Sequence, residues 1–206
     1  GIARDDPDFF PAYVLNYTFG GGGFESRLMK ELRVQKGLTY GIYTGLSTGD
    51  HLNLWTGGGQ TKNESAGEFI DGIKAEMEEI VADGVTDQEL SDAKAYLTGS
   101  YPLSFDSNSA IASNLMSVRL EDLGIDYFDK RNAMVEAVTM DDVNRIAATY
   151  LKPENFTFIV VGEPEGITEV ATLPESVTGE VDIDEAGDMQ ETGSEETTDA
   201  SRDETD

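Results

Sequence analysis

A glycine-rich stretch near the start of the chain carries the side chains best suited to chemistry. It opens with four consecutive glycines: Gly20, Gly21, Gly22 and Gly23. Phe24 follows, and then an amphipathic segment that bears Arg33 and ends at Gly37, a typical helix stop. The chain then reverses into a strand that bears Tyr40. The reversal predicts that Tyr40 lies beside Arg33, where a guanidinium and a phenol could together hold a carbonyl or an oxyanion.

Spacing alone also fits structural roles for the same residues. Arg33 could pair with Glu31 or another nearby acid on the surface, and Tyr40 could be a half-buried aromatic of the strand. The glycine run precedes a helix, as phosphate-binding loops do. It lacks the Lys-Ser/Thr of a P-loop and the spacing of a dinucleotide fingerprint, so a tight turn between two helices is the alternative.

The inventory of metal-ligating and nucleophilic residues is small. The chain has no cysteine and one histidine, His51, in a strand-turn context. A single histidine cannot form the paired-histidine motifs of zinc enzymes, so no metal ligand is assigned. It also lies far from any Gly-x-Ser-x-Gly elbow, so serine hydrolase chemistry has no support.

The charge is strongly acidic, with 41 Asp and Glu against 14 Lys and Arg and a net charge of −27. A field of this sign repels nucleic acid and anionic lipid, so neither is an expected partner. It suits basic peptides as well as a protein that must stay dissolved in salt. No apolar run of about 18 residues is present, so no membrane span is expected.

The elements that must position these side chains follow from periodicity and capping. We predict helices over 8–19, 24–36, 63–82, 86–100, 108–123, 127–137 and 139–151, and strands over 39–47, 51–59 and 156–161. Capping boxes are predicted at Thr61–Glu64, Thr86–Glu89 and Thr139–Asp142. The mixture predicts an α+β fold, with helices packed on one face of a mainly antiparallel sheet. Residues 1–173 form the predicted domain, and 174–206 read as an acidic, disordered tail.

Several motifs in order resemble one family. They are Gly20–Leu28, Leu32–Arg33 and Lys36–Tyr40, together with the flanking segments Gly1–Asp8, Asp92–Leu103 and Phe156–Gly162. These resemble the C-terminal half of pitrilysin-type (insulinase-type) zinc metallopeptidases, and above all bacterial members related to mitochondrial processing peptidase. The resemblance covers about residues 1–170. It implies the same α+β fold and one more strand just before residue 1.

The resemblance also implies a function shared between two halves. Arg33 and Tyr40 would reach an active site built by the other half and bind the scissile carbonyl as it becomes tetrahedral. The glycines 20–23 and Phe24 would lie at the edge of the substrate channel. A zinc-bearing N-terminal half or partner subunit would supply the zinc and the glutamate base, so this chain alone would be inactive.

Two alternatives to a peptidase half stay open. Several relatives of such peptidases are inactive structural or assembly subunits, and a stand-alone peptide-binding module would also fit the acidic charge. The resemblance to bacterial members implies a periplasmic rather than a cytoplasmic location.

Overall fold

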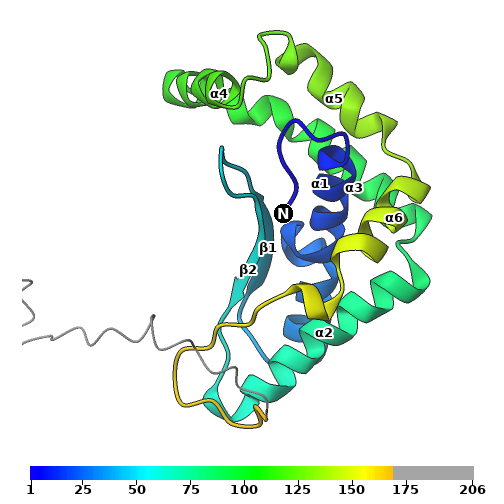
Figure 1. Ribbon diagram of the computed structural model, residues 1–206, viewed down its shortest axis with the longest axis vertical. Coiled ribbons are helices and arrows are strands. Elements are labelled where there is room, and N and C mark those ends of the chain that lie inside the picture. Colours follow the sequence, from blue (N-terminus) through cyan, green and yellow to red (C-terminus); the bar gives the residue numbers. More distant parts are fainter. Residues whose placement is uncertain (169–206) are drawn as a thin grey trace, which may run out of the picture. The chain divides into compact units, whose positions relative to one another are not determined.

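The strands form one antiparallel hairpin in the computed structural model, which describes residues 1–168 (Figure 1). Strand β1 (Ile42–Ser47) pairs with β2 (Leu54–Gly59), and the register places Ile42 opposite Gly59 and Ser47 opposite Leu54. Alternate side chains of a strand point to opposite faces. One face of the hairpin therefore packs on the core through Ile42, whereas Tyr43 on the other face is 66% exposed.

Six α-helices and several shorter helical turns make up most of the rest of the described chain. The α-helices are α1 (Phe9–Asn16), α2 (Ala66–Asp83), α3 (Asp87–Gly99), α4 (Asn108–Leu120), α5 (Tyr127–Ala137) and α6 (Met140–Tyr150). Figure 1 shows α1 beside the hairpin, with α2, α3 and α6 on the same side of it. This arrangement confirms the predicted α+β class with helices on one face of an antiparallel sheet.

The core lies between the hairpin and these helices. Its largest fully buried side chains are Phe19, Leu15, Leu28, Leu32, Ile80, Ile146, Leu151, Val14, Val135 and Val143. Leu28 and Leu32 belong to the segment that bears Arg33, so burial of apolar area fixes that segment to the helical layer. Among residues 1–168, no helix is long and apolar enough to cross a membrane. The predicted boundary at residue 173 and the predicted tail lie outside the described residues.

Two of the three predicted capping boxes are confirmed. The Thr86 hydroxyl accepts from the Glu89 backbone N–H at the start of α3, and the Glu89 carboxylate accepts from the Thr86 backbone N–H. Thr139 and Asp142 form the same reciprocal pair at the start of α6. Each box satisfies backbone donors that a helix N-terminus leaves without partners.

The capping box predicted at Thr61 and Glu64 is wrong. The Thr61 hydroxyl instead donates to the Leu38 carbonyl at 2.7 Å, a residue 23 positions earlier. A short 3₁₀ turn, Asn63–Ser65, then leads into α2 without a side-chain cap. A tertiary partner thus competes with the local backbone for this hydroxyl, and sequence spacing does not reveal that competition.

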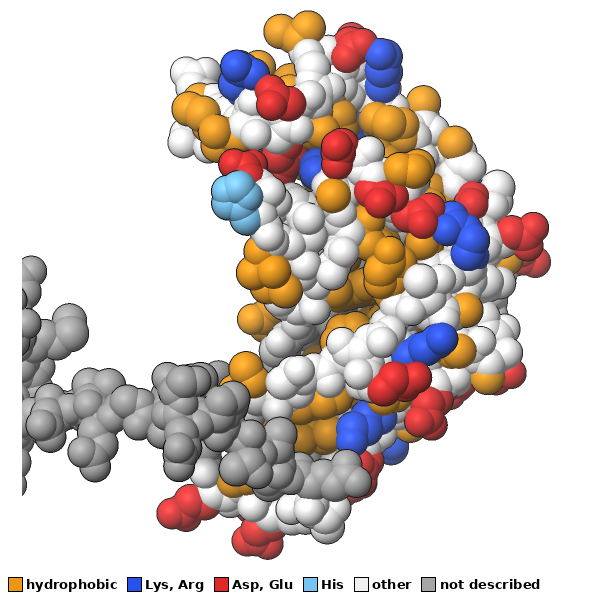
Figure 2. All heavy atoms as spheres, viewed as in Figure 1, with side chains coloured by type: hydrophobic (Ala, Val, Ile, Leu, Met, Phe, Trp, Pro, Cys, Tyr) orange, Lys and Arg blue, Asp and Glu red, His pale blue; other side chains and the backbone are white. Residues whose placement is uncertain are grey.

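The strand predicted over 156–161 is also wrong. This segment has no strand partner among the described residues, and Ile159 and Val161 are 86% and 95% exposed. It borders a groove of about 1000 Å³ that is also lined by residues of both strands and of α2. Figure 2 shows hydrophobic side chains in the hollow beside the hairpin. An apolar run forms a strand only when a neighbouring strand pairs with its backbone. The extra strand predicted before residue 1 stays a prediction.

Asn16, at the end of α1, joins that helix to both strands. Its side-chain oxygen accepts from the Thr44 hydroxyl at 2.8 Å and from the Trp55 indole N–H at 2.9 Å. Its amide also donates to the Thr44 carbonyl at 3.3 Å. Asn16 is only 7% exposed, so these bonds form where water competes weakly.

Replacing Asn16 with Leu should destabilise the protein by about 1–3 kcal/mol, because Thr44 and Trp55 would lose their shared buried partner. Urea unfolding followed by Trp55 fluorescence, the protein's one tryptophan, measures the change. The control Asn108→Leu alters an exposed asparagine at the start of α4. Equal stabilities for the two variants would show that the Asn16 bonds do not hold the hairpin.

Candidate functional site

The four glycines begin inside one segment of π-helix, which holds Gly20 and Gly21, and end before a second one. The first, Tyr17–Gly21, continues α1, and the Gly22 N–H donates to the Tyr17 carbonyl five residues earlier. The second, Met29–Gln35, carries Arg33 and ends with the Lys36 N–H donating to the Glu31 carbonyl. The helix predicted over 24–36 therefore begins only after Ser26, which is extended, and its backbone is mostly not α-helical. π-Helical turns are rare and occur frequently at functional sites.

Three of the glycines are required by close packing. A Cβ on Gly20 would lie 2.5 Å from the Thr44 hydroxyl oxygen, and one on Gly21 would lie 2.4 Å from the Asn16 amide nitrogen. A Cβ on Gly22 would lie 2.7 Å from the Tyr17 carbonyl oxygen. At these positions the loop packs closely against α1 and β1, so the glycines have a packing role whether or not they face a substrate.

Gly23 differs from these three glycines. A Cβ there would meet no other atom, and it is the backbone conformation that favours glycine. Its φ is +58°, a left-handed conformation that glycine adopts without strain. The buried Ser26 hydroxyl donates to the Gly23 carbonyl at 2.7 Å and fixes the short 3₁₀ turn Gly23–Glu25. This turn presents Phe24 at the surface, where its side chain is 58% exposed.

A bidentate ion pair anchors the segment to α3. The Arg27 guanidinium donates to both carboxylate oxygens of Glu89, at 2.6 and 2.8 Å, and to the Gly84 carbonyl at 3.0 Å. Burial disfavours the charged form of Glu89, but bonds from Arg27 and Thr86 outweigh burial and lower its carboxyl pKa to about 2. Sequence reasoning assigned Glu89 to the α3 cap and missed Arg27, since 62 residues separate the partners.

Arg33 lies on the ring of Phe24 and not on a carboxylate. Its guanidinium carbon is 4.3 Å from the ring centroid, within the range of a cation–π interaction. The Glu31 carboxylate, the alternative partner considered from the sequence, pairs with Lys36 at 3.1 Å. Within residues 1–168, Arg33 is the one arginine that forms neither a hydrogen bond nor an ion pair. Its N–H donors are therefore available to a ligand.

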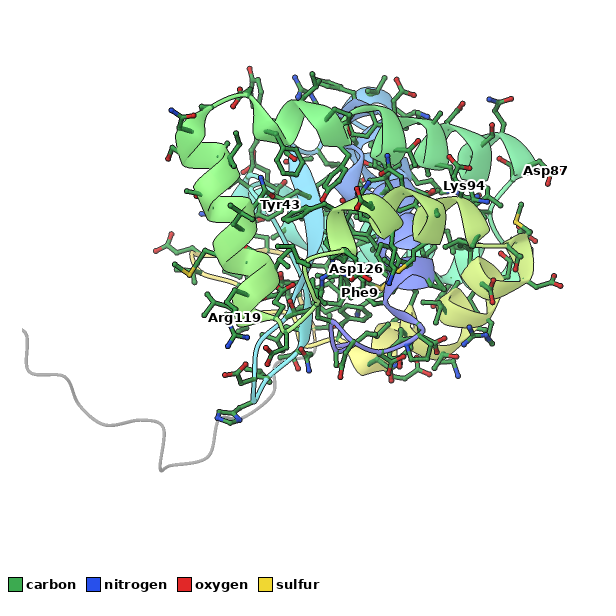
Figure 3. All side chains as sticks on the ribbon, turned by 90° about the horizontal axis from the view of Figure 1, so that it is seen from above. Phe9, Tyr43, Asp87, Lys94, Arg119 and Asp126 are labelled. Carbon is green, nitrogen blue, oxygen red and sulfur yellow. The ribbon has the colours of Figure 1, made fainter. Side chains whose placement is uncertain are left out.

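Tyr40 lies just before β1 and is 91% exposed, so it is not the half-buried strand aromatic of the alternative interpretation. Its hydroxyl forms no hydrogen bond within the described part of the chain, and none joins it to Arg33. Gly37, with φ of +65°, makes the reversal that separates the two residues. Tyr43, three residues further on, also projects from the hairpin and is 66% exposed (Figure 3).

No group of three or more His, Asp and Glu side chains within residues 1–168 could hold a metal ion. His51 lies between the two strands and is exposed. The described residues therefore do not fit the zinc that the family resemblance implies, and no step of the chemistry is assigned to a metal on this domain.

Comparison with known proteins agrees with this geometry. The sequence pattern of a family described as "Peptidase M16 inactive domain" matches residues 1–97. A crystal structure of a peptidase M16 inactive domain from Pseudomonas fluorescens superposes with a TM-score of 0.68 and 31% identity, over 75% of this chain and 37% of that one. The fold is that of a peptidase M16 inactive domain. The match confirms the resemblance to the zinc-free half of such peptidases.

Two curated relatives carry contrasting names. "Non-peptidase homolog YmxG" of Helicobacter pylori is 28% identical over 154 residues, which are 75% of this chain and 35% of that protein. "Uncharacterized zinc protease YmxG" of Bacillus subtilis is 32% identical over 115 residues, 55% of this chain and 28% of that protein. The chain thus spans about a third of the length of the curated relatives it matches.

Replacing Gly20 with Ala should destabilise the protein by about 1–3 kcal/mol, because Asn16 holds the Thr44 side chain that the new methyl would contact too closely. The control Gly45→Ala adds a methyl to β1 where nothing lies within 4 Å. Urea unfolding of both variants measures the difference. Equal stabilities would mean that the loop is free to move away from β1.

The Arg27–Glu89 pair should make the free energy of unfolding depend on pH. A carboxyl pKa lowered from 4.5 to about 2 stabilises the folded state fully above pH 4.5, and the contribution disappears as the pH falls towards 2. Glu89→Gln should therefore lower the melting temperature by a few degrees at pH 7 and by much less near pH 2. Thermal unfolding of both proteins across this range tests it. A constant difference between them would contradict an ionised Glu89 as the cause.

Proposed function

We propose that this M16 inactive domain binds peptide substrate and supports the transition state of a zinc endopeptidase whose metal lies in another domain or subunit. The observation that supports this proposal most directly concerns the Arg33 side chain. Its guanidinium lies on an aromatic ring, and its N–H groups donate to no other group of the described residues. Among the arginines of residues 1–168, Arg131 also lacks a carboxylate partner, but it donates to the Leu97 carbonyl, whereas Arg33 donates to no group. Its availability favours a ligand as its partner.

The proposed role follows from the donors of the two side chains. The Arg33 guanidinium and the Tyr40 hydroxyl would donate to the carbonyl oxygen of the scissile peptide, which gains negative charge as the carbon becomes tetrahedral. Donors that are already in place stabilise that charge without reorganising. Closure of a second half over the exposed Tyr40 would remove water and strengthen both bonds.

The proposed function also implies a partner protein or domain and a class of substrate. The zinc of the proposed enzyme would come from another half or subunit, since no group of three or more His, Asp and Glu side chains within residues 1–168 could hold a metal ion. The substrate would be an extended peptide or an unfolded segment, with the exposed Phe24 at the edge of its channel. A net charge of −27 would favour basic peptides. For the assembled protein we propose a periplasmic location.

The second candidate function is a structural or assembly subunit without peptidase activity. It is favoured by the relative named "Non-peptidase homolog", which shares 28% identity with this chain over 154 residues. The two proposals differ in the consequence of losing Arg33 and Tyr40. An assembly subunit needs neither donor.

Substituting Tyr40 with Phe should lower kcat of the assembled peptidase at least tenfold, because one lost transition-state donor typically costs a factor of about 100–1,000. Arg33→Ala should have a similar or larger effect. Both side chains lie outside the buried core, so neither change should alter the melting temperature by more than a degree or two. Cleavage of a fluorogenic peptide by this chain mixed with its zinc-bearing half, with zinc and then with a chelator, provides the assay.

The control is Tyr96→Phe, which removes the hydroxyl of another exposed tyrosine, on α3. It should leave kcat unchanged. Association of the halves without cleavage would instead support the assembly subunit. Unchanged turnover in Tyr40→Phe and Arg33→Ala would refute the proposed role of these residues even in an active enzyme.

A further inference from the structure

We infer that Phe24 is the positioning residue of Arg33: its ring holds the guanidinium at the peptide site while leaving the N–H donors unshared. The inference rests on the proposed function for the use of those donors. The contact itself is a property of this chain and can be measured without catalysis. This positioning role gives a reason for the aromatic residue in the loop at 20–25, which the close packing of the glycines does not provide.

The geometry of the contact supports this assignment. The Arg33 guanidinium carbon lies 4.3 Å from the centroid of the Phe24 ring. An aromatic face attracts a cation through its quadrupole and accepts none of the in-plane N–H groups as a carboxylate would. Arg27 shows the contrasting case, since its bonds to Glu89 and to the Gly84 carbonyl occupy its donors.

The carboxylates nearest to this contact along the sequence are engaged elsewhere. Glu25, next to Phe24, pairs with Lys30 at 3.2 Å. Glu31, two residues before Arg33, pairs with Lys36 at 3.1 Å. The local sequence thus supplies a lysine for each nearby acid and leaves the aromatic ring as the neighbour of the guanidinium.

The ring itself is held by the backbone of the loop. Gly23 adopts φ of +58°, and its carbonyl accepts from the Ser26 hydroxyl at 2.7 Å, a side chain with no solvent exposure. The Ser26 N–H donates to the same carbonyl at 3.1 Å. These bonds fix the turn Gly23–Glu25 and so the place of Phe24, although the ring is 58% exposed.

The first test is spectroscopic and uses the full chain. The Nε–H signal of Arg33, identified by its loss in Arg33→Lys, should show the upfield shift of a proton above an aromatic face. Phe24→Leu should abolish the shift, and Phe24→Tyr should retain it because an aromatic face remains. The control Phe158→Leu removes the ring near Lys74, a second cation–π contact on α2, and should leave the Arg33 signal unchanged. An Arg33 signal that is the same in Phe24→Leu and wild type would overturn the inference.

The second test uses the assembled peptidase. Phe24→Leu should lower kcat about two- to fivefold with KM within twofold, and Phe24→Tyr should restore it, as expected for a partly exposed cation–π contact. In an Arg33→Ala background the Phe24→Leu change should have no further effect. Equal losses in both backgrounds would overturn the positioning role. An Arg33→Ala variant with normal kcat would refute the proposed function alone, and the Arg33 signal would still decide whether Phe24 positions it.

Discussion

The site depends on one anchor, the bidentate pair between Arg27 and Glu89. Glu89 caps α3 and at the same time holds the segment that carries the second π-helix, so a helix start and the glycine loop share one carboxylate. The buried neighbours Leu28 and Leu32 add apolar area to the same junction. Because the segment is fixed at this point, the following turn can hold the half-buried Arg33 in place.

Two arginines six residues apart show how the same side chain takes opposite roles. Arg27 is largely buried, and its donors are used by Glu89 and a backbone carbonyl. Arg33 is half-buried and lies on an aromatic ring. In a chain with a threefold excess of acids over bases, the second state requires that nearby carboxylates have other partners, and Lys30 and Lys36 provide them. Local placement of lysines therefore matters more to Arg33 than the net charge does.

Sequence patterns predicted those parts of the fold that local interactions determine. The boxes at Thr86 and Thr139 and the helix over 127–137 depend on neighbours within a few residues, and the structure confirms them. The wrong predictions concern residues whose structure depends on partners distant in the sequence. Leu38 takes the Thr61 hydroxyl, and the apolar segment 156–161 has no strand beside it within the described residues. The π-helical form of the Arg33 segment also has no local signature, because apolar spacing at three and four residues fits an α-helix as well.

The glycine run shows why a motif needs its structure before it is given a function. Gly20, Gly21 and Gly22 each lie where a Cβ would strike Thr44, Asn16 or the Tyr17 carbonyl, so packing alone requires them. Gly23 is required by its φ, and the consequence of that φ is the exposed ring of Phe24. A loop built only for a tight turn would not need an exposed aromatic at its tip. The residue in this loop that packing leaves unexplained is Phe24, and the guanidinium above it supplies a reason for its place.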